Sequence, residues 1–352
     1  SCKHPTHAPV PVTGACWLRP MIPLYLYIGV LTLLGIYGTH RFWQLGLYLS
    51  HRRRLAEQQP RAHWRSLPSV TVQIPMFNES PVAERVIEAA ARLDYPRDRL
   101  QIQILDDSTD RCAAIARQCA QRLRDQGLDV DYRHRAARSG YKAGALDAGL
   151  HHATGEFVAI FDADFIPPRD FLRHTVHFFT DERVGLVQTS WDHLNRNESW
   201  LTRAQALALD GHFEIEQVAR AGGDRWFNFN GTAGIWRRAC IDEAGGWEQD
   251  TLTEDADLAY RAQLRGWRFL YLPDLRCPAE LPPDVPALLG QQYRWNKGLI
   301  QNGLKLLPRI LTAREPAARR LEVWFHLTSP LLYIVLFVLT LLVPLTVLFD
   351  VD

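Results

Sequence analysis

Short apolar runs alternate with segments of helical spacing along most of the chain, and this alternation constrains the fold more than any other feature. The runs that predict strands lie at 70–74, 101–105, 130–132, 157–161, 184–188 and 268–272. The segments that predict helices lie at 82–92, 111–126, 141–151, 200–220 and 255–265. Alternation of this kind is typical of a doubly wound α/β fold with a mostly parallel sheet. Ligands bind such sheets beyond the carboxyl ends of the strands.

Acidic side chains follow two of the predicted strands. The run at 101–105 leads into Asp106 and Asp107, and the run at 157–161 leads into Asp162 and Asp164. Two carboxylates one residue apart can share a hard divalent cation, and Mg²⁺ prefers one or two carboxylates together with phosphate oxygens. A cation there would offset the charge that develops on a departing diphosphate. Because aspartate is also common in turns, this pattern alone leaves a metal site and an ordinary turn equally open.

Two further clusters admit both a functional and a structural interpretation. The sequence TED (253–255) opens a predicted helix. Acidic residues cap helices, but a carboxylate held at a helix start is also rigid enough to act as a general base. In the sequence QQYRW (291–295), Arg294 can hold a phosphate and Trp295 can stack on a sugar ring. The same aromatic and basic residues are typical of a membrane interface.

Two apolar stretches without charge bracket this region. Residues 21–38 and 331–349 each reach the ~18–20 residues that a helix needs to cross the hydrocarbon core. Arginines are frequent after the first stretch and before the second, whereas only Lys3 and Arg19 precede the first. The positive-inside rule therefore predicts a cytoplasmic central region and an extracytoplasmic N-terminus. A buried core helix is the alternative for either stretch, and a signal peptide for the first, although no small-residue cleavage site follows it.

The overall charge is balanced, with 40 Lys and Arg against 39 Asp and Glu in 352 residues. A nucleic-acid-binding protein normally has a basic excess, so we expect no nucleic acid among the partners. None of the six cysteines has CxxC spacing, and the sequence predicts no structural zinc site.

Seven ordered motifs resemble those of family 2 glycosyltransferases, in particular the processive cellulose synthase superfamily and its mannan and glucan synthase-like branch. They are IPMFNE (74–79), LDDS (105–108), YKAGAL (141–146), FDADF (161–165), FNFNGTAGIWRR (227–238), TEDADLAYRA (253–262) and QQYRWNKG (291–298). The resemblance covers most of residues 70–300. It implies a GT-A fold, which is a Rossmann-like, mostly parallel sheet, flanked by transmembrane helices. It also implies inverting transfer of a sugar from a sugar nucleotide donor to a growing glycan acceptor.

The resemblance also assigns roles to single positions. The residues that would bind the donor nucleotide are Glu79, Asp107, Lys142, Asp162, Gln291 and Arg294. Asp162 and Asp164 would bind Mg²⁺ or Mn²⁺, and Asp255 would be the general base. The residues that would bind the acceptor are Asn230, Gly231, Thr232, Glu254 and Trp295.

The expected layout is that of a multi-pass protein of the cell membrane, either inner or plasma membrane. Its parts are an extracytoplasmic N-terminus (1–20), a transmembrane helix (21–40), a cytoplasmic GT-A domain (41–283), the QxxRW motif with amphipathic interface helices (284–325) and a second transmembrane helix (326–350). One amphipathic helix is predicted at 299–310, where a core helix is the alternative. Contact with membrane lipid follows from this layout, and further membrane subunits or self-association would complete a translocation channel.

The expected activity is processive synthesis of a β-glucan, mannan or glucomannan from UDP-glucose or GDP-mannose. The sequence FNFNGT (227–232) departs from the FFCGS-like form of true cellulose synthases and is closer to the mannan and glucan synthase-like branch. One alternative is a non-processive enzyme that moves a single sugar to a polyprenyl phosphate, although such enzymes usually lack a QxxRW motif. A catalytically silent scaffold or nucleotide sensor is a further alternative, which the intact set of Asp107, Asp164 and Asp255 disfavours.

Overall fold

The computed structural model describes residues 18–348, and the chain divides into two compact units. One unit is residues 43–328, and the other is residues 1–42 together with 329–352. Residues 1–17 and 349–352, which include most of the predicted extracytoplasmic segment, lie outside the described residues.

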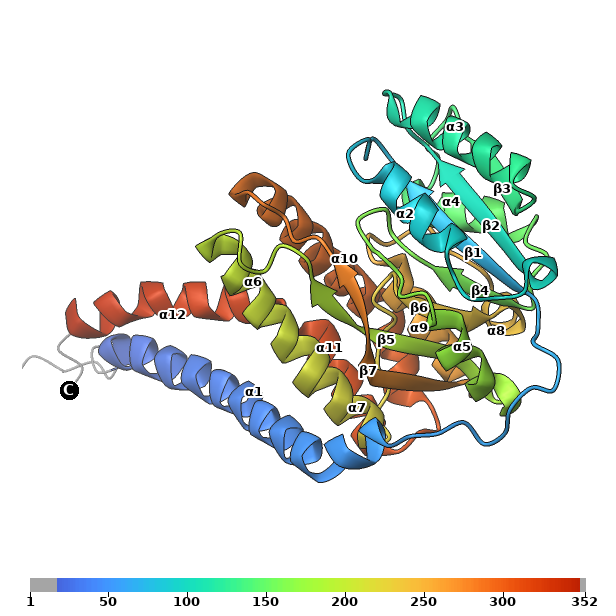
Figure 1. The fold of residues 1–352 in the computed structure, drawn as a ribbon. Helices are drawn as coiled ribbons and strands as arrows, with labels where there is room; N and C mark the ends of the chain where they lie inside the picture. Colours follow the sequence, from blue (N-terminus) through green and yellow to red (C-terminus); the bar gives the residue numbers. More distant parts are fainter. Residues whose placement is uncertain (1–17, 349–352) are drawn as a thin grey trace, which may run out of the picture. The chain divides into compact units, whose positions relative to one another are not determined.

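A seven-stranded sheet in the order β3-β2-β1-β4-β6-β5-β7 is the centre of the larger unit (Figure 1). The strands are β1 Val70–Met76, β2 Leu100–Asp106, β3 Asp129–His134, β4 Phe157–Ile160, β5 Val184–His193, β6 Gly234–Arg237 and β7 Arg268–Ala279. All neighbouring strands are parallel except β6, which is antiparallel to both β4 and β5. The predicted α/β fold with a mostly parallel sheet is therefore confirmed. The sequence analysis assigned no strand to β6, because four residues are too few to show a periodic pattern.

Helices cover both faces of the sheet. One apolar cluster joins β1 and β2 to α2 Ala83–Ala91, α3 Cys112–Asp125 and α5 Phe171–Thr175. A second cluster joins β4 and β6 to α4 Tyr141–Leu150, α7 Val218–Gly222, α8 Arg238–Glu243 and α9 Glu254–Leu264. Every residue of β1 and β2 is buried. That continuous burial is the reason these strands read as apolar runs rather than as an alternation.

The segment predicted as one long helix at 200–220 is interrupted. It begins as α6 Trp200–Asp210, continues as a π-helix over Gly211–Gln217 and ends as α7. A wider turn of this kind is uncommon, and it often occurs at functional sites. Sequence spacing did not reveal it, because the apolar period changes little over a single wide turn.

The QxxRW motif and the predicted amphipathic helix lie on one continuous helix, α10 Val285–Thr312. The prediction of a separate helix at 299–310 is therefore wrong in its start, since α10 begins before the motif. A third apolar cluster joins α10 to α9 and to α11 Ala317–Thr328, through Tyr260, Leu306, Ile310, Val323 and Leu327.

The two predicted membrane stretches fall on helices at the ends of the described chain. Residues 21–38 lie within α1 Leu18–Ala56, and most of 331–349 lies within α12 Leu331–Leu348. Over residues 18–348, no helix by itself has the length and hydropathy needed to cross a membrane. The segments Ala317–Thr328 and Leu331–Pro344 meet both requirements only when taken together as a bent pair.

Candidate active site

The sheet brings two distant motifs to the same edge. Asp162 follows the carboxyl end of β4, and Ile160 of β4 pairs with Gly234 of the antiparallel strand β6. The residues just before β6 therefore lie beside the end of β4. The Asp162 amide donates a hydrogen bond to Thr232 Oγ1 at 2.9 Å, which fastens the DxD turn to the FNFNGT motif.

Lys142 links the same two motifs from the first turn of α4. Its Nζ lies 2.5 Å from Asp162 Oδ1 and donates to the Gly231 carbonyl oxygen at 3.0 Å. Burial alone would lower the pKa of Lys142, but the carboxylates of Asp162 and Glu254 outweigh it, so the pKa lies above its usual value. The ammonium is therefore a permanent positive charge at this site.

Gly231 lets the backbone pass between Lys142 and Asp255. It has φ +81°, a conformation that side chains other than glycine rarely adopt. A Cβ at this position would lie 3.0 Å from Asp255 Oδ2 and 3.3 Å from Lys142 Nζ. Asp255 itself lies in the first turn of α9, where its Oδ1 accepts a hydrogen bond from the Ala256 amide at 2.8 Å. The predicted general base is thus next to both the FNFNGT motif (227–232) and Lys142.

Acidic groups crowd this site. Burial, followed by the charge of Glu254, raises the pKa of Asp255 to about 7. Burial and then the charge of Asp162 raise the pKa of Asp164 to about 7 as well. The pKa of Glu79 rises to about 8 through burial and then the charges of Asp164 and Asp162. Burial also raises the pKa of Glu254.

In these electrostatic interactions the five carboxylates face two cations, the Lys142 ammonium and the Arg138 guanidinium, which acts on Glu79. A divalent cation would balance the excess negative charge, and two carboxylates one residue apart are a suitable oxygen donor set for Mg²⁺ or Mn²⁺. Asp162 and Asp164 are the residues that would hold it, as the sequence predicts.

Asp106 and Asp107, the first acidic pair, are both held by hydrogen bonds within the domain. Asp106 is fully buried and accepts hydrogen bonds from Tyr132 Oη and the Ser108 amide, both at 2.8 Å. Asp107 is 4% exposed and accepts two hydrogen bonds from Arg135, at 2.7 and 2.6 Å. Arg135 was not predicted, because an arginine in the loop RHRAARSG has no spacing that marks it. The role of Asp107 in nucleotide binding stays a prediction.

A residue of the π-helix contacts the FNFNGT motif (227–232). Asn230 Oδ1 accepts hydrogen bonds from Asn228 Nδ2 and contacts His212 Nε2, both at 3.0 Å. Its Nδ2 is buried and, among residues 18–348, has no hydrogen-bond partner. The hydroxyl of Thr232 instead faces the DxD turn. Sequence reasoning did not find His212, since a single histidine on a predicted helix carries no motif.

Gln291, Arg294 and Trp295 lie together on the first half of α10. Arg294 is exposed, whereas Gln291 and Trp295 are half-buried. Among residues 18–348, no hydrogen bond or ion pair joins these side chains to Asp162, Asp164 or Asp255. Their proposed contacts with the diphosphate and the acceptor stay predictions.

A family model for "Glycosyltransferase like family 2" matches residues 68–298. The chain belongs to this family. The predicted family membership is therefore confirmed, and the matched region contains every predicted site residue from Glu79 to Trp295.

Relatives with known names lie in the branch that the motifs indicate. The chain is 49% identical over 239 residues to glucomannan 4-beta-mannosyltransferase 2 of Arabidopsis thaliana, which covers 66% of this chain and 45% of the relative. It is 45% identical over 239 residues to glucomannan 4-beta-mannosyltransferase 7 of the same plant, with 66% and 43% covered. The chain thus spans somewhat less than half the length of these relatives.

A solved structure supports the fold assignment. The mannosyltransferase PcManGT from Pyrobaculum calidifontis, in complex with GDP-Man and Mn²⁺, matches with a TM-score of 0.67. The match covers 92% of this chain and 85% of that one, at 24% sequence identity. At this identity the likeness shows the fold alone, and it agrees with a GT-A-like glycosyltransferase domain.

Proposed function

We propose that this glycosyltransferase transfers mannose from GDP-mannose to a hydroxyl of a growing β-linked mannan or glucomannan. The names of the plant relatives support the mannosyl donor and the 4-linked product. The observation that carries the proposal is the convergence of Asp255, Gly231 and Lys142, since it joins a base, the acceptor motif and a phosphate-binding cation in one place. UDP-glucose remains the competing donor.

In the proposed mechanism, Asp255 takes the proton from the acceptor hydroxyl. A carboxylate whose pKa is about 7 suits this role, because a general base works best when its pKa is near the operating pH. The acceptor oxygen then attacks the anomeric carbon opposite the leaving diphosphate, and one displacement inverts an α-linked donor to a β-linked product. The Lys142 ammonium stabilises the departing diphosphate, and Arg294 joins it from α10.

A divalent cation bound by Asp162 and Asp164 would supply further neutralisation of the diphosphate. The backbone amide of Asp162 is held by Thr232, so the orientation of this turn depends on the acceptor motif. Each of these groups acts by binding or orientation, and only Asp255 moves a proton.

Processive synthesis at a membrane is part of the proposal. Large apolar side chains are exposed on both flanking helices, among them Tyr25 and Ile36 of α1 and Tyr333 and Phe337 of α12. Exposed apolar surface of this kind marks contact with lipid or with another protein. We propose a multi-pass protein of the cell membrane with the catalytic domain in the cytoplasm, in which further membrane subunits or self-association complete the passage for the glycan.

Substitution of the general base tests the mechanism. We expect Asp255→Asn to lose roughly 10²–10⁴-fold in turnover, which is the usual contribution of a general base, while GDP-mannose binding by calorimetry is retained. Asp242→Asn, an exposed acid on α8, is the matched control and should keep full turnover. Near-normal polymerisation by Asp255→Asn would refute the assigned base.

The donor and product identify the reaction. The full-length chain is offered GDP-mannose, UDP-glucose and UDP-N-acetylglucosamine in turn with Mn²⁺, and the products are sized by mass spectrometry. A polymer from GDP-mannose is the expected product. A single mannose on a polyprenyl phosphate would instead identify the non-processive alternative, and nucleotide binding without any transfer would identify a sensor.

A further inference from the structure

One face of α10 is fastened to the segment that carries the general base. We call residues 248–257 the TED segment. Gly298, Gln301, Asn302 and Lys305 recur at positions i, i+3, i+4 and i+7, so they share one face of the helix. All four contact the TED segment, and they begin one turn after Arg294 and Trp295.

Three of these residues hold the middle of the TED segment. The Leu252 amide donates to Gln301 Oε1 at 2.9 Å, and Asn302 Nδ2 donates to the Thr253 carbonyl oxygen at 3.0 Å and to its Oγ1 at 2.9 Å. A Cβ at Gly298 would lie only 2.8 Å from the Thr253 backbone nitrogen. The glycine of the QxxRWxxG sequence is therefore the position at which the two backbones come close enough for these bonds.

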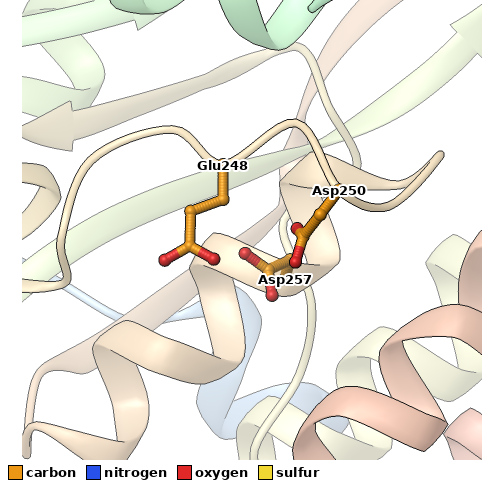
Figure 2. A group of neighbouring side chains, drawn as sticks. All are labelled: Glu248, Asp250 and Asp257. Atoms are coloured by element: carbon orange, nitrogen blue, oxygen red, sulfur yellow. The ribbon is translucent and has the colours of Figure 1, made fainter.

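Lys305 holds the two ends. Its Nζ lies 2.5 Å from Glu248 Oε2, 2.7 Å from Asp250 Oδ1 and 2.9 Å from Asp257 Oδ1. Figure 2 shows the three carboxylates turned toward one another, with Glu248 and Asp250 on the loop and Asp257 on α9. Asp257 is fully buried, and its second oxygen lies 2.6 Å from Arg261.

Three oxygens within 4.8 Å of one another are a spacing that could hold a metal ion. The ammonium of Lys305 already lies within 3 Å of all three, and the Arg261 guanidinium lies 2.6 Å from Asp257 and 3.6 Å from Glu248, so the cluster has its cations built into the chain. Burial alone would lower the pKa of Lys305, but hydrogen bonds to Asp250 and Glu248 raise it above its usual value. Without the Lys305 charge, only Arg261 among these two cations would face the three carboxylates, and their mutual repulsion just before and just after Asp255 would increase.

We propose that Lys305 is a positioning residue for the transfer reaction. It fastens the TED segment, which carries Asp255, to α10, which also carries Arg294. The inference rests on the proposed roles of Asp255 and Arg294. α10 carries Arg294 at one end of the face and Lys305 at the other, and a helix is stiff over this distance. The base and the diphosphate-binding residues are thereby held in one geometry by a single element.

The test is a kinetic comparison of Lys305→Met with Lys305→Arg and Arg309→Met in the full-length chain. Arg309→Met removes an exposed cation from the same helix one turn further on, and it should leave kcat and the KM for the donor unchanged. Lys305→Met should lower kcat by roughly 100-fold, since a displacement of ~1 Å in a reacting group costs about that much. Its KM for the donor should stay the same, and Lys305→Arg should recover most of the lost kcat.

A loss confined to KM, a normal kcat in Lys305→Met, or an equal loss in Arg309→Met would overturn the proposal. If Lys305→Met does not fold, Gln301→Met is tested in its place. It removes the bond to the Leu252 amide and should lower kcat by a smaller factor than the roughly 100-fold expected for Lys305→Met. An unchanged kcat in that variant would also overturn the proposal. The assay uses whichever donor the wild type accepts, so a failure of GDP-mannose as donor is seen in the wild type and is separate from the effect of Lys305.

Discussion

Gly231→Ala is the perturbation whose effect follows most directly from the geometry. The added methyl group would lie 3.0 Å from Asp255 Oδ2, whereas ordinary contact begins at 3.4 Å. The base must therefore retreat by about 0.4 Å, and a 1 Å misplacement costs on the order of 100-fold in rate. Scaled to 0.4 Å, with Lys142 Nζ also crowded at 3.3 Å, we expect kcat to fall roughly 10-fold.

The stability cost of the same substitution is separable from its catalytic cost. A side chain at φ +81° lowers the free energy of unfolding by about 1–2 kcal/mol. Replacing glycine also reduces the conformational freedom of the unfolded chain, which offsets about 0.4–1 kcal/mol of that loss. Gly127 has the same φ of +81°, and a Cβ there would meet only Arg97 Nη1 at 4.0 Å. Gly127→Ala is therefore a matched control for the backbone strain alone.

The assay combines a thermal melt with initial rates of nucleoside diphosphate release. Both alanine variants should lose about the same melting temperature, a few degrees at most for a domain of this size. Only Gly231→Ala should lose turnover. Equal turnover in the two variants would refute the idea that Gly231 is needed for the placement of Asp255, and a fall in both would trace the effect to the backbone strain.

Three further predictions concern charge and hydrogen bonding at the site. The raised pKa values of Glu79, Asp164 and Asp255 mean that the folded chain holds protons more tightly than the unfolded chain. The melting temperature of the metal-free protein should therefore fall as pH rises from about 5 through about 8, and Mn²⁺ should recover most of that loss at pH 8. A melting temperature that rises over this pH range contradicts the argument. Thr232→Val leaves the Asp162 amide without its acceptor, at a cost of about 1–3 kcal/mol, and should weaken Mn²⁺ binding by calorimetry, whereas Thr232→Ser should not. Arg135→Met removes both of its hydrogen bonds to the buried Asp107 and leaves the 4.0 Å ion pair of Asp107 with Arg138, so it should lower the free energy of unfolding by at most about 3–5 kcal/mol in a denaturant titration; an effect below about 1 kcal/mol would mean that Arg138 or water replaces the lost guanidinium.

The sequence predicted those features that depend on local pattern. Buried parallel strands are recognised in the sequence as apolar runs. The end of each run then indicates that the acidic residues next to it lie at the carboxyl ends of β2 and β4. The motifs then identified Lys142, Gly231 and Asp255, which the structure brings together. β6 and the π-helix at Gly211–Gln217 were not predicted, because four residues and one wide turn leave no period to detect.

The supporting residues of the site could not be predicted from the sequence, because they act through contacts between distant elements. Arg135, His212 and Lys305 each pair with a residue at least 18 positions away, and their own neighbours in the sequence give no sign of it. In all three cases the partner lies within a recognised motif: Asp107, Asn230 and Asp257. A motif names the groups that do chemistry, whereas the groups that hold them are chosen by the packing of that particular chain. Residues that support a site are therefore best sought among the partners of motif residues, and the α10 face was found in this way.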